Sequence, residues 1–509
     1  MKTIKILILF FAIAINCAYG QTYDLDLTAT MVKSNGPWKK GSKVHLTKFV
    51  HDVELIISQY NTDSKDLFYL EDDKGNQVEI NSKVDDCFEF EYKNAQDFWD
   101  ASIITNVLYQ LKKKGFQYNL RKEMEDDALQ YIHEVKSRGL EFNDPFLNTY
   151  IYSLIAKIAP FHIIDGRPGN VNIIIQENPT IDICCYPNGT IVLNTGLLAV
   201  LHSEDELVAV LAHEIAHFIL DHAVQNVNAA ISRQKRAEFW SGLLTGLTAV
   251  AESYVAYKTD YYIPGRATLA MAEISTSIAS EVVDRLGMKY NHEQEEEADK
   301  YAYYILKTLG YDRYALSTAL TRIKMEYIYD RNNAVYVDSY THPALMKRIM
   351  RLGSPNLTCN KNFEQIVSFA VSSVAMMKYS DRRFRQCLTY VNQNIKNGVA
   401  TADDYILKAN CILSTKNDDI SNQEVISLIN KAKNLDSKNI NIYKAEILAT
   451  LRVGDKAKAI SLLTSYVESL NNYNIENINN EITWDNINNY IKEEIDWSNK
   501  MIIKLNGMQ

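Results

Sequence analysis

The chain has 509 residues, of which 47% are hydrophobic and 23% are charged, so it is long enough for two or three domains with a sizeable core. Its formal net charge of -9 is spread along the sequence, and no basic stretch indicates a nucleic-acid-binding surface. This composition is typical of a globular protein and excludes broad disorder.

The first twenty residues have the pattern of a signal peptide. Lys2 and Lys5 precede an apolar run at residues 6–15, and small residues near Gly20 predict cleavage before Gln21. An uncleaved membrane anchor is the alternative, although the run is short for a membrane span. We therefore expect an exported protein, periplasmic or secreted. No later stretch predicts a transmembrane span in the mature chain, whose six cysteines permit disulfides without fixing their pairing.

Residues 21–98 alternate between apolar and polar positions and predict a small β module, which we interpret as SH3-like. Beyond it the period becomes helical, and Asp144 before Pro145 predicts the start of a helix. A buried strand is expected at residues 171–175. Asn188 and Gly189 predict a hairpin between residues 181–186 and 190–193, with residues 190–194 as the edge strand of the sheet.

A capping pattern at Ser203 and Glu206 predicts the next helix, which is apolar almost all round. This helix carries His213, Glu214 and His217. Residues four apart lie on one face of a helix, so the two imidazoles can hold one metal ion. Glu214 lies beside them and can act as a general base toward a water on the metal. The motif predicts one Zn²⁺ per chain and hydrolysis of peptide bonds.

Catalytic zinc needs a third protein ligand and one open position. His222 is excluded if the helix continues straight, because it would then point away from the metal. An acidic helix offers a better candidate, since Glu295 and Asp299 share one face and Asp299 could orient a ligating histidine. His342, in a segment far along the chain, is a further candidate.

These motifs together resemble the gluzincin metallopeptidases of the CAAX prenyl protease and HtpX-like family. The resemblance covers about residues 120–355 and implies that Glu295 is the third metal ligand. It also implies that His342 approaches the metal or the oxyanion, and that Arg348 pairs nearby. The chain departs from the family at residues 182–189, which puts its substrate preference in doubt. His342 is therefore expected either to gate the zinc or to stabilise the oxyanion.

Residues 356–509 predict an all-helical domain with a loose tetratricopeptide-like pattern, in which small residues such as Ala432 let paired helices pack closely. This arrangement makes the chain similar to the soluble periplasmic members of the family that carry such repeats. Repeat surfaces bind extended partners, so a protein partner on these helices is expected.

The predicted architecture is multidomain. A leader at residues 1–20 and the β module at 21–98 precede an α+β zincin-type metallopeptidase domain at 99–355 and the helical domain at 356–509. The expected function is that of a zinc metalloendopeptidase acting on unfolded or extended polypeptides, such as exported or misfolded envelope proteins. The alternative is a periplasmic chaperone or assembly scaffold with latent protease activity.

Overall fold

The structure is a computed structural model that describes residues 21–34, 38–58, 61–71, 77–80, 88–104, 116–137, 140–159, 171–233, 286, 288–331, 342, 344–472 and 481–507. The predicted leader lies outside these residues. The chain divides into two compact units, the first of which consists of Met1–Asn119, Leu154–Asn170 and Lys300–Arg313. The second unit consists of Leu120–Ser153, Val171–Asp299 and Tyr314–Gln509.

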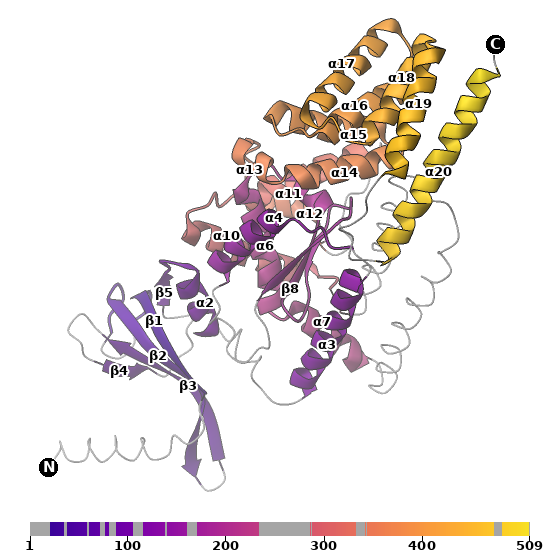
Figure 1. Ribbon diagram of the computed structural model, residues 1–509. Helices are drawn as coiled ribbons and strands as arrows, with labels where there is room; N and C mark the ends of the chain where they lie inside the picture. The colour runs from indigo at the N-terminus through magenta and orange to yellow at the C-terminus, as the bar shows by residue number, and fades with distance from the viewer. Residues whose placement is uncertain are drawn as a thin grey trace, which may run out of the picture. The chain divides into compact units, whose positions relative to one another are not determined.

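The first unit contains an antiparallel five-stranded sheet in the order β4-β3-β2-β1-β5 (Figure 1). Alternate side chains of β1 are buried, as expected for a strand with one face on a core. Phe49 and Phe68 stack across neighbouring strands with ring centroids 5.0 Å apart. The predicted N-terminal β region is therefore present, while its SH3-like topology stays a prediction. The elements are β1 Gln21–Met31, β2 Lys43–Ser58, β3 Asn61–Glu71, β4 Gln77–Ile80, β5 Phe88–Glu91 and α2 Ala95–Ile104.

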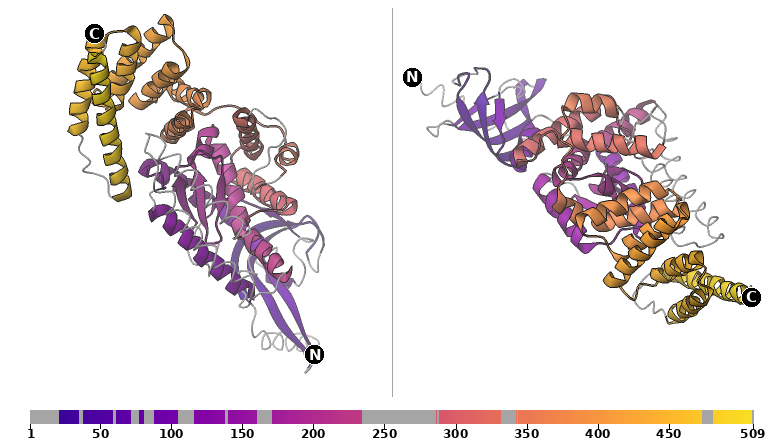
Figure 2. Two further views of the ribbon diagram at one scale, coloured as in Figure 1. Left: turned by 90° about the vertical axis from the view of Figure 1, so that its right-hand side faces the viewer. Right: turned by 90° about the horizontal axis from the view of Figure 1, so that it is seen from above.

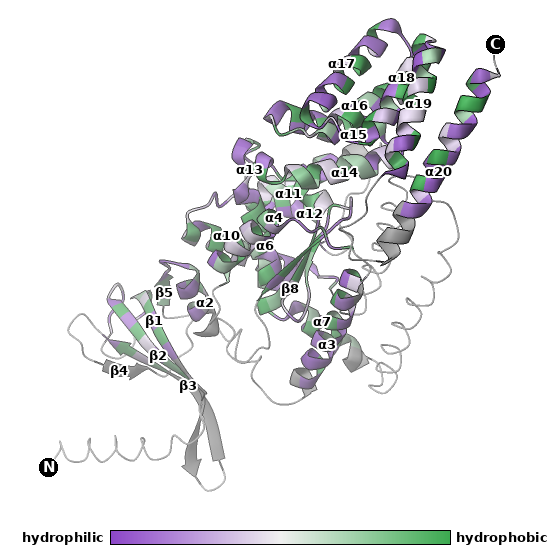
Figure 3. Ribbon diagram, in the orientation of Figure 1, coloured by the Kyte–Doolittle hydropathy of each residue, from purple (hydrophilic) through white to green (hydrophobic). Residues whose placement is uncertain are grey.

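The sheet of the second unit has three strands in the order β6-β8-β7 (Figure 1). β6 (Asn172–Gln176) runs parallel to β8 (Thr190–Asn194), and β7 (Ile183–Cys185) pairs with β8 in the predicted hairpin. The expectation that residues 190–194 form an edge strand is wrong, because β8 is paired on both sides. β7 is instead an edge strand of this sheet. All five residues of β8 are buried, and the green colouring of this strand in Figure 3 shows that it is largely apolar.

Helix starts in the second unit follow the predicted caps. The Asp144 side chain accepts hydrogen bonds from two backbone N–H groups at the start of α4. The Ser203 side chain accepts one from the N–H of Glu206 at the start of α6. α6 is buried along almost its whole length. The helices are α3 Phe116–Ser137, α4 Pro145–Ile158, α5 Thr195–Val200, α6 Glu204–Ile219, α7 His222–Arg233, α10 His292–Leu309, α11 Ala315–Arg331 and α12 Leu345–Leu352.

α6 does not continue into α7. Asp221 has a φ of 57°, a left-handed conformation that interrupts the helix. The axis bends by 45° at this break. Within the described residues no single helix is both long and apolar enough to cross a membrane. Only the bent pair formed by α6 and the first part of α7 meets the length and composition requirement together.

The C-terminal region is all helical, and each helix from α14 to α20 packs against the next one along the chain (Figures 1 and 2). Gly398 and Gly454 end two of these helices with positive φ angles of 75° and 82°. The assignment of the C-terminal region as tetratricopeptide-like stays a prediction. The helices are α13 Lys361–Ile366, α14 Ser368–Ser380, α15 Phe384–Asn397, α16 Ala402–Thr415, α17 Asp419–Leu435, α18 Asn441–Val453, α19 Lys456–Asn471 and α20 Glu481–Asn506.

Candidate metal centre and active site

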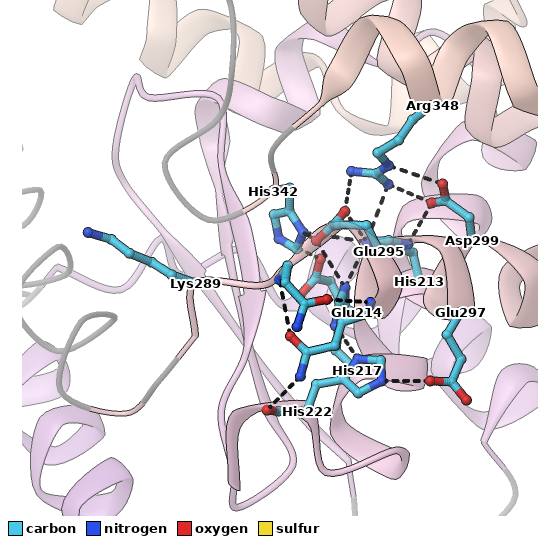
Figure 4. Close-up of polar contacts among 12 residues, drawn as sticks. His213, Glu214, His217, His222, Lys289, Glu295, Glu297, Asp299, His342 and Arg348 are labelled. Atoms are coloured by element: carbon cyan, nitrogen blue, oxygen red, sulfur yellow. Dashed lines mark hydrogen bonds and ion pairs between the residues drawn. The ribbon is translucent and has the colours of Figure 1, made fainter. Parts of the chain in front are cut away.

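Two histidines one turn apart on α6 form the base of the candidate site (Figure 4). The side chains of His213 and His217 are both buried, and their Nε2 atoms lie 3.1 Å apart. At this distance the two ring nitrogens can share a proton in a hydrogen bond or bind a common cation. Burial lowers the pKa of His217, and the cationic neighbours lower it further. The neutral imidazole that results is the form that binds metals.

Glu295, near the start of α10, completes a set of three donors. Its carboxylate oxygens lie 3.6 Å from the Nε2 atom of His213 and 3.5 Å from that of His217. A tetrahedral zinc ion with bonds of about 2.0–2.1 Å separates neighbouring ligand atoms by about 3.3 Å. The spacing of these three donors therefore fits a zinc ion, and their types match a catalytic His₂Glu set.

His342 brings a fourth donor to the same place. Its Nδ1 atom lies 2.9 Å from Glu295 Oε1 and 3.5 Å from His213 Nε2. One donor atom from each of His213, His217, Glu295 and His342 falls within 4.8 Å of the others. The structure thus brings together the three predicted ligands and His342, from segments 129 residues apart along the sequence.

Glu214 lies next to this cluster but is not one of its four donors. Its Oε2 atom accepts a hydrogen bond of 3.1 Å from the backbone N–H of Cys185 on β7. Its Oε1 atom lies 3.2 Å from His342 Nε2. Burial raises the pKa of Glu214 to about 7, although the nearby His342 opposes the shift. A carboxylate with a pKa near neutrality, beside the donors but outside them, suits a general base.

Asp299 and Arg348 contact the proposed ligands (Figure 4). Asp299 Oδ1 lies 3.2 Å from the Nδ1 atom of His213, on the side of the ring opposite the donor cluster. Arg348 contacts Asp299 at 2.6 Å and Glu295 at 2.5 Å. Burial alone would raise the pKa of Asp299, but Arg348 and His213 hold it well below its usual range. The carboxylate is thus kept ionised, as a partner that orients a ligating histidine must be.

His222 contacts the other histidine ligand, His217. Sequence reasoning missed this contact. Its Nδ1 atom lies 2.8 Å from His217 Nδ1, and its Nε2 atom lies 3.3 Å from Glu297. The ring of Tyr290 stacks on His217 with centroids 3.7 Å apart. His222 stays outside the four-donor cluster, as predicted, but it contacts His217 instead of pointing away from the site. The break at Asp221 turns it back, and the prediction had assumed a straight helix.

A cavity of about 50 Å³ adjoins His213 and Glu214. Most of its other lining side chains are apolar and come from α5, α6, α11 and α12. They include Leu197, Val210, Leu316, Leu320, Ile323 and Leu345. The cavity therefore has room for more than one water-sized group, and its lining suits an apolar side chain.

Comparison with known proteins supports the same chemistry. Residues 145–356 match peptidase family M48. The beta-barrel assembly-enhancing protease of Escherichia coli K12 is 25% identical over 203 residues, which cover 38% of this chain and 36% of that protein. The beta-barrel assembly-enhancing protease of Yersinia pestis is 24% identical with the same coverage. The alignments thus span little more than a third of these relatives.

Residues 145–356 thus resemble a family M48 peptidase domain, as the sequence motifs indicated. Metallopeptidases of this family are metal-dependent, and the buried His213, His217, Glu295 and His342 cluster could bind a metal.

Proposed function

We propose that the chain is a zinc-dependent metalloendopeptidase of the cell envelope that cleaves extended segments of exported or misfolded proteins. The observation that carries this proposal is the separation of roles at the site: three donors spaced for zinc, with a buried carboxylate beside them. The names of the relatives, which describe proteases that enhance β-barrel assembly, favour an envelope substrate. The predicted leader favours export to the periplasm or release.

His213, His217 and Glu295 would hold the ion. When bound, zinc polarises a carbonyl oxygen and lowers the pKa of a coordinated water. Glu214 would take a proton on the carboxylate oxygen that faces the donors and return it to the leaving amine. Asp299 and Arg348 keep His213 and Glu295 oriented throughout, because both are buried and held by short contacts.

An extended substrate can add to the edge of a sheet through main-chain hydrogen bonds. β7 offers such an edge, and its residue Cys185 lies directly beside the general base. The apolar cavity next to Glu214 would take the side chain that follows the scissile bond, since the leaving amine receives its proton from Glu214. An aliphatic residue at that position suits the apolar lining of this cavity.

Glu214→Gln separates the peptidase from the chaperone or scaffold alternative. The substitution is nearly isosteric and spares all four donors, so zinc content and fold should persist while cleavage of an unfolded protein falls about 10²–10⁴-fold. Unchanged cleavage would reject Glu214 as the base. If neither protein cleaves any unfolded substrate but both suppress its aggregation, the chaperone alternative holds.

His342→Ala separates the two roles open to His342. We favour a gate, because His342 already lies among the donors and could fill the position that catalysis needs open. Its removal should then speed cleavage and weaken zinc binding. Slower cleavage with unchanged zinc affinity would instead identify His342 as an oxyanion donor, whose loss costs about 2.7–4 kcal/mol of transition-state stabilisation.

A further inference from the structure

A second group of metal-binding side chains lies where the segment before α6 meets the start of the C-terminal helices. It consists of His202, Cys359 and Glu364, and one donor atom from each lies within 4.8 Å of the other two. We propose that these three residues form a second metal site, separate from the peptidase centre, that binds a zinc ion.

The types of the three donor atoms indicate which metal this site would bind. An imidazole, a thiolate and a carboxylate suit zinc, whereas magnesium and calcium prefer oxygen ligands alone. The Nδ1 atom of His202 is hydrogen-bonded to Glu364 Oε1 at 2.5 Å, so the two side chains are adjacent and a metal would bind in place of this hydrogen bond. Three protein ligands leave one position of a tetrahedral ion open, and Cys359 is exposed, so water can reach that position.

Hydrogen bonds that do not involve the donor atoms fix the backbone around them. The N–H of His202 donates to Glu206 Oε2 at 3.1 Å, and its carbonyl accepts from the N–H of Asn360 at 2.8 Å. The N–H of Glu364 donates to the carbonyl of Asn360 at 3.0 Å. The backbone segments that carry the donors are thus held together before a metal arrives, which lowers the entropic cost of binding.

Arg322 holds the backbone next to Cys359. It donates a hydrogen bond to the carbonyl of Thr358 at 2.9 Å, and its guanidinium lies 4.0 Å from the Cys359 sulfur.

The site would link two parts of the second unit. His202 directly precedes Ser203, the N-cap of the helix that carries the peptidase histidines. Cys359 and Glu364 flank the N-cap of α13, where the C-terminal helices begin. An ion bound here would hold the start of α6 to the start of α13, and its loss would lower the thermal stability of the junction.

Cobalt substitution tests this site independently of the proposed peptidase activity. A thiolate bound to Co²⁺ gives a charge-transfer band in the near ultraviolet, whereas the two histidines and the glutamate of the peptidase centre contain no thiolate. We expect full-length protein loaded with Co²⁺ to show this band, and Cys359→Ser to lose it. Cys411→Ala, which removes a buried thiol that belongs to neither donor group, should retain it.

Zinc content provides the second measurement. After gel filtration, Cys359→Ser should carry about one zinc ion fewer per chain than the wild type. Glu364→Gln, which preserves a hydrogen-bonding partner for His202, should lose the same ion. The proposal is overturned if the wild type lacks the thiolate band, if Cys359→Ser retains it, or if neither variant loses zinc.

Discussion

Arg348 contacts two buried carboxylates, so its replacement gives a quantitative test of the site. It contacts Glu295 and Asp299 and is itself only 2% exposed. Removing one partner of a buried ion pair typically costs about 3–5 kcal/mol. In Arg348→Met, Glu295 keeps His342 and Asp299 keeps Arg351, so we expect the low end of that range, about 3 kcal/mol.

Urea unfolding in the presence of a chelator measures this loss through the transition midpoint and slope. With saturating zinc the cost should shrink, because a divalent cation then compensates Glu295. Arg351→Met is the matched control, since Arg351 contacts the same Asp299 but its side chain is 37% exposed, and its loss should cost less than about 1 kcal/mol. A loss below about 1 kcal/mol for Arg348→Met, or the same loss with and without zinc, would refute the reasoning.

Three further substitutions test the surroundings of the site. His222→Ala removes the partner of His217, so zinc should be retained with about 10–100-fold lower affinity in chelator competition, and unchanged affinity would show that His222 does not orient the ligand. Leu320→Trp fills the apolar cavity and should reduce cleavage before bulky aliphatic residues about 10–200-fold in a peptide mixture. Cleavage before glycine or alanine should persist. An unchanged product pattern would exclude the cavity as a substrate subsite. Gly196→Ala would place a Cβ atom 2.5 Å from the carbonyl oxygen of Pro179, so thermal unfolding should show a loss of about 1–3 kcal/mol, and wild-type stability would mean that this backbone can yield.

The sequence predicted the site best where the functional residues lie close together along the chain. His213, Glu214 and His217 lie within five consecutive residues of one helix, so helical periodicity alone places them together. The caps at Asp144 and Ser203 are equally local, and both side chains accept backbone N–H hydrogen bonds at the predicted helix starts.

The errors arose where distant segments decide the geometry. A hairpin signal predicts that β7 and β8 pair, but it carries no information about which of them also pairs with β6. The break after α6 was missed because Asp221, not glycine, adopts the left-handed conformation. Arg121, 100 residues earlier, pairs with the Asp221 carboxylate and stabilises that turn, and no pattern near α6 reveals this partner.

The register of β7 has a consequence for the timing of catalysis. The outward N–H of Cys185, which an added strand would need, is already bonded to Glu214. A peptide that paired at this point would therefore have to displace the carboxylate from the strand. Binding of the peptide to β7 and release of Glu214 from the Cys185 N–H would then occur together. Without a bound peptide, Glu214 would stay hydrogen-bonded to this backbone group.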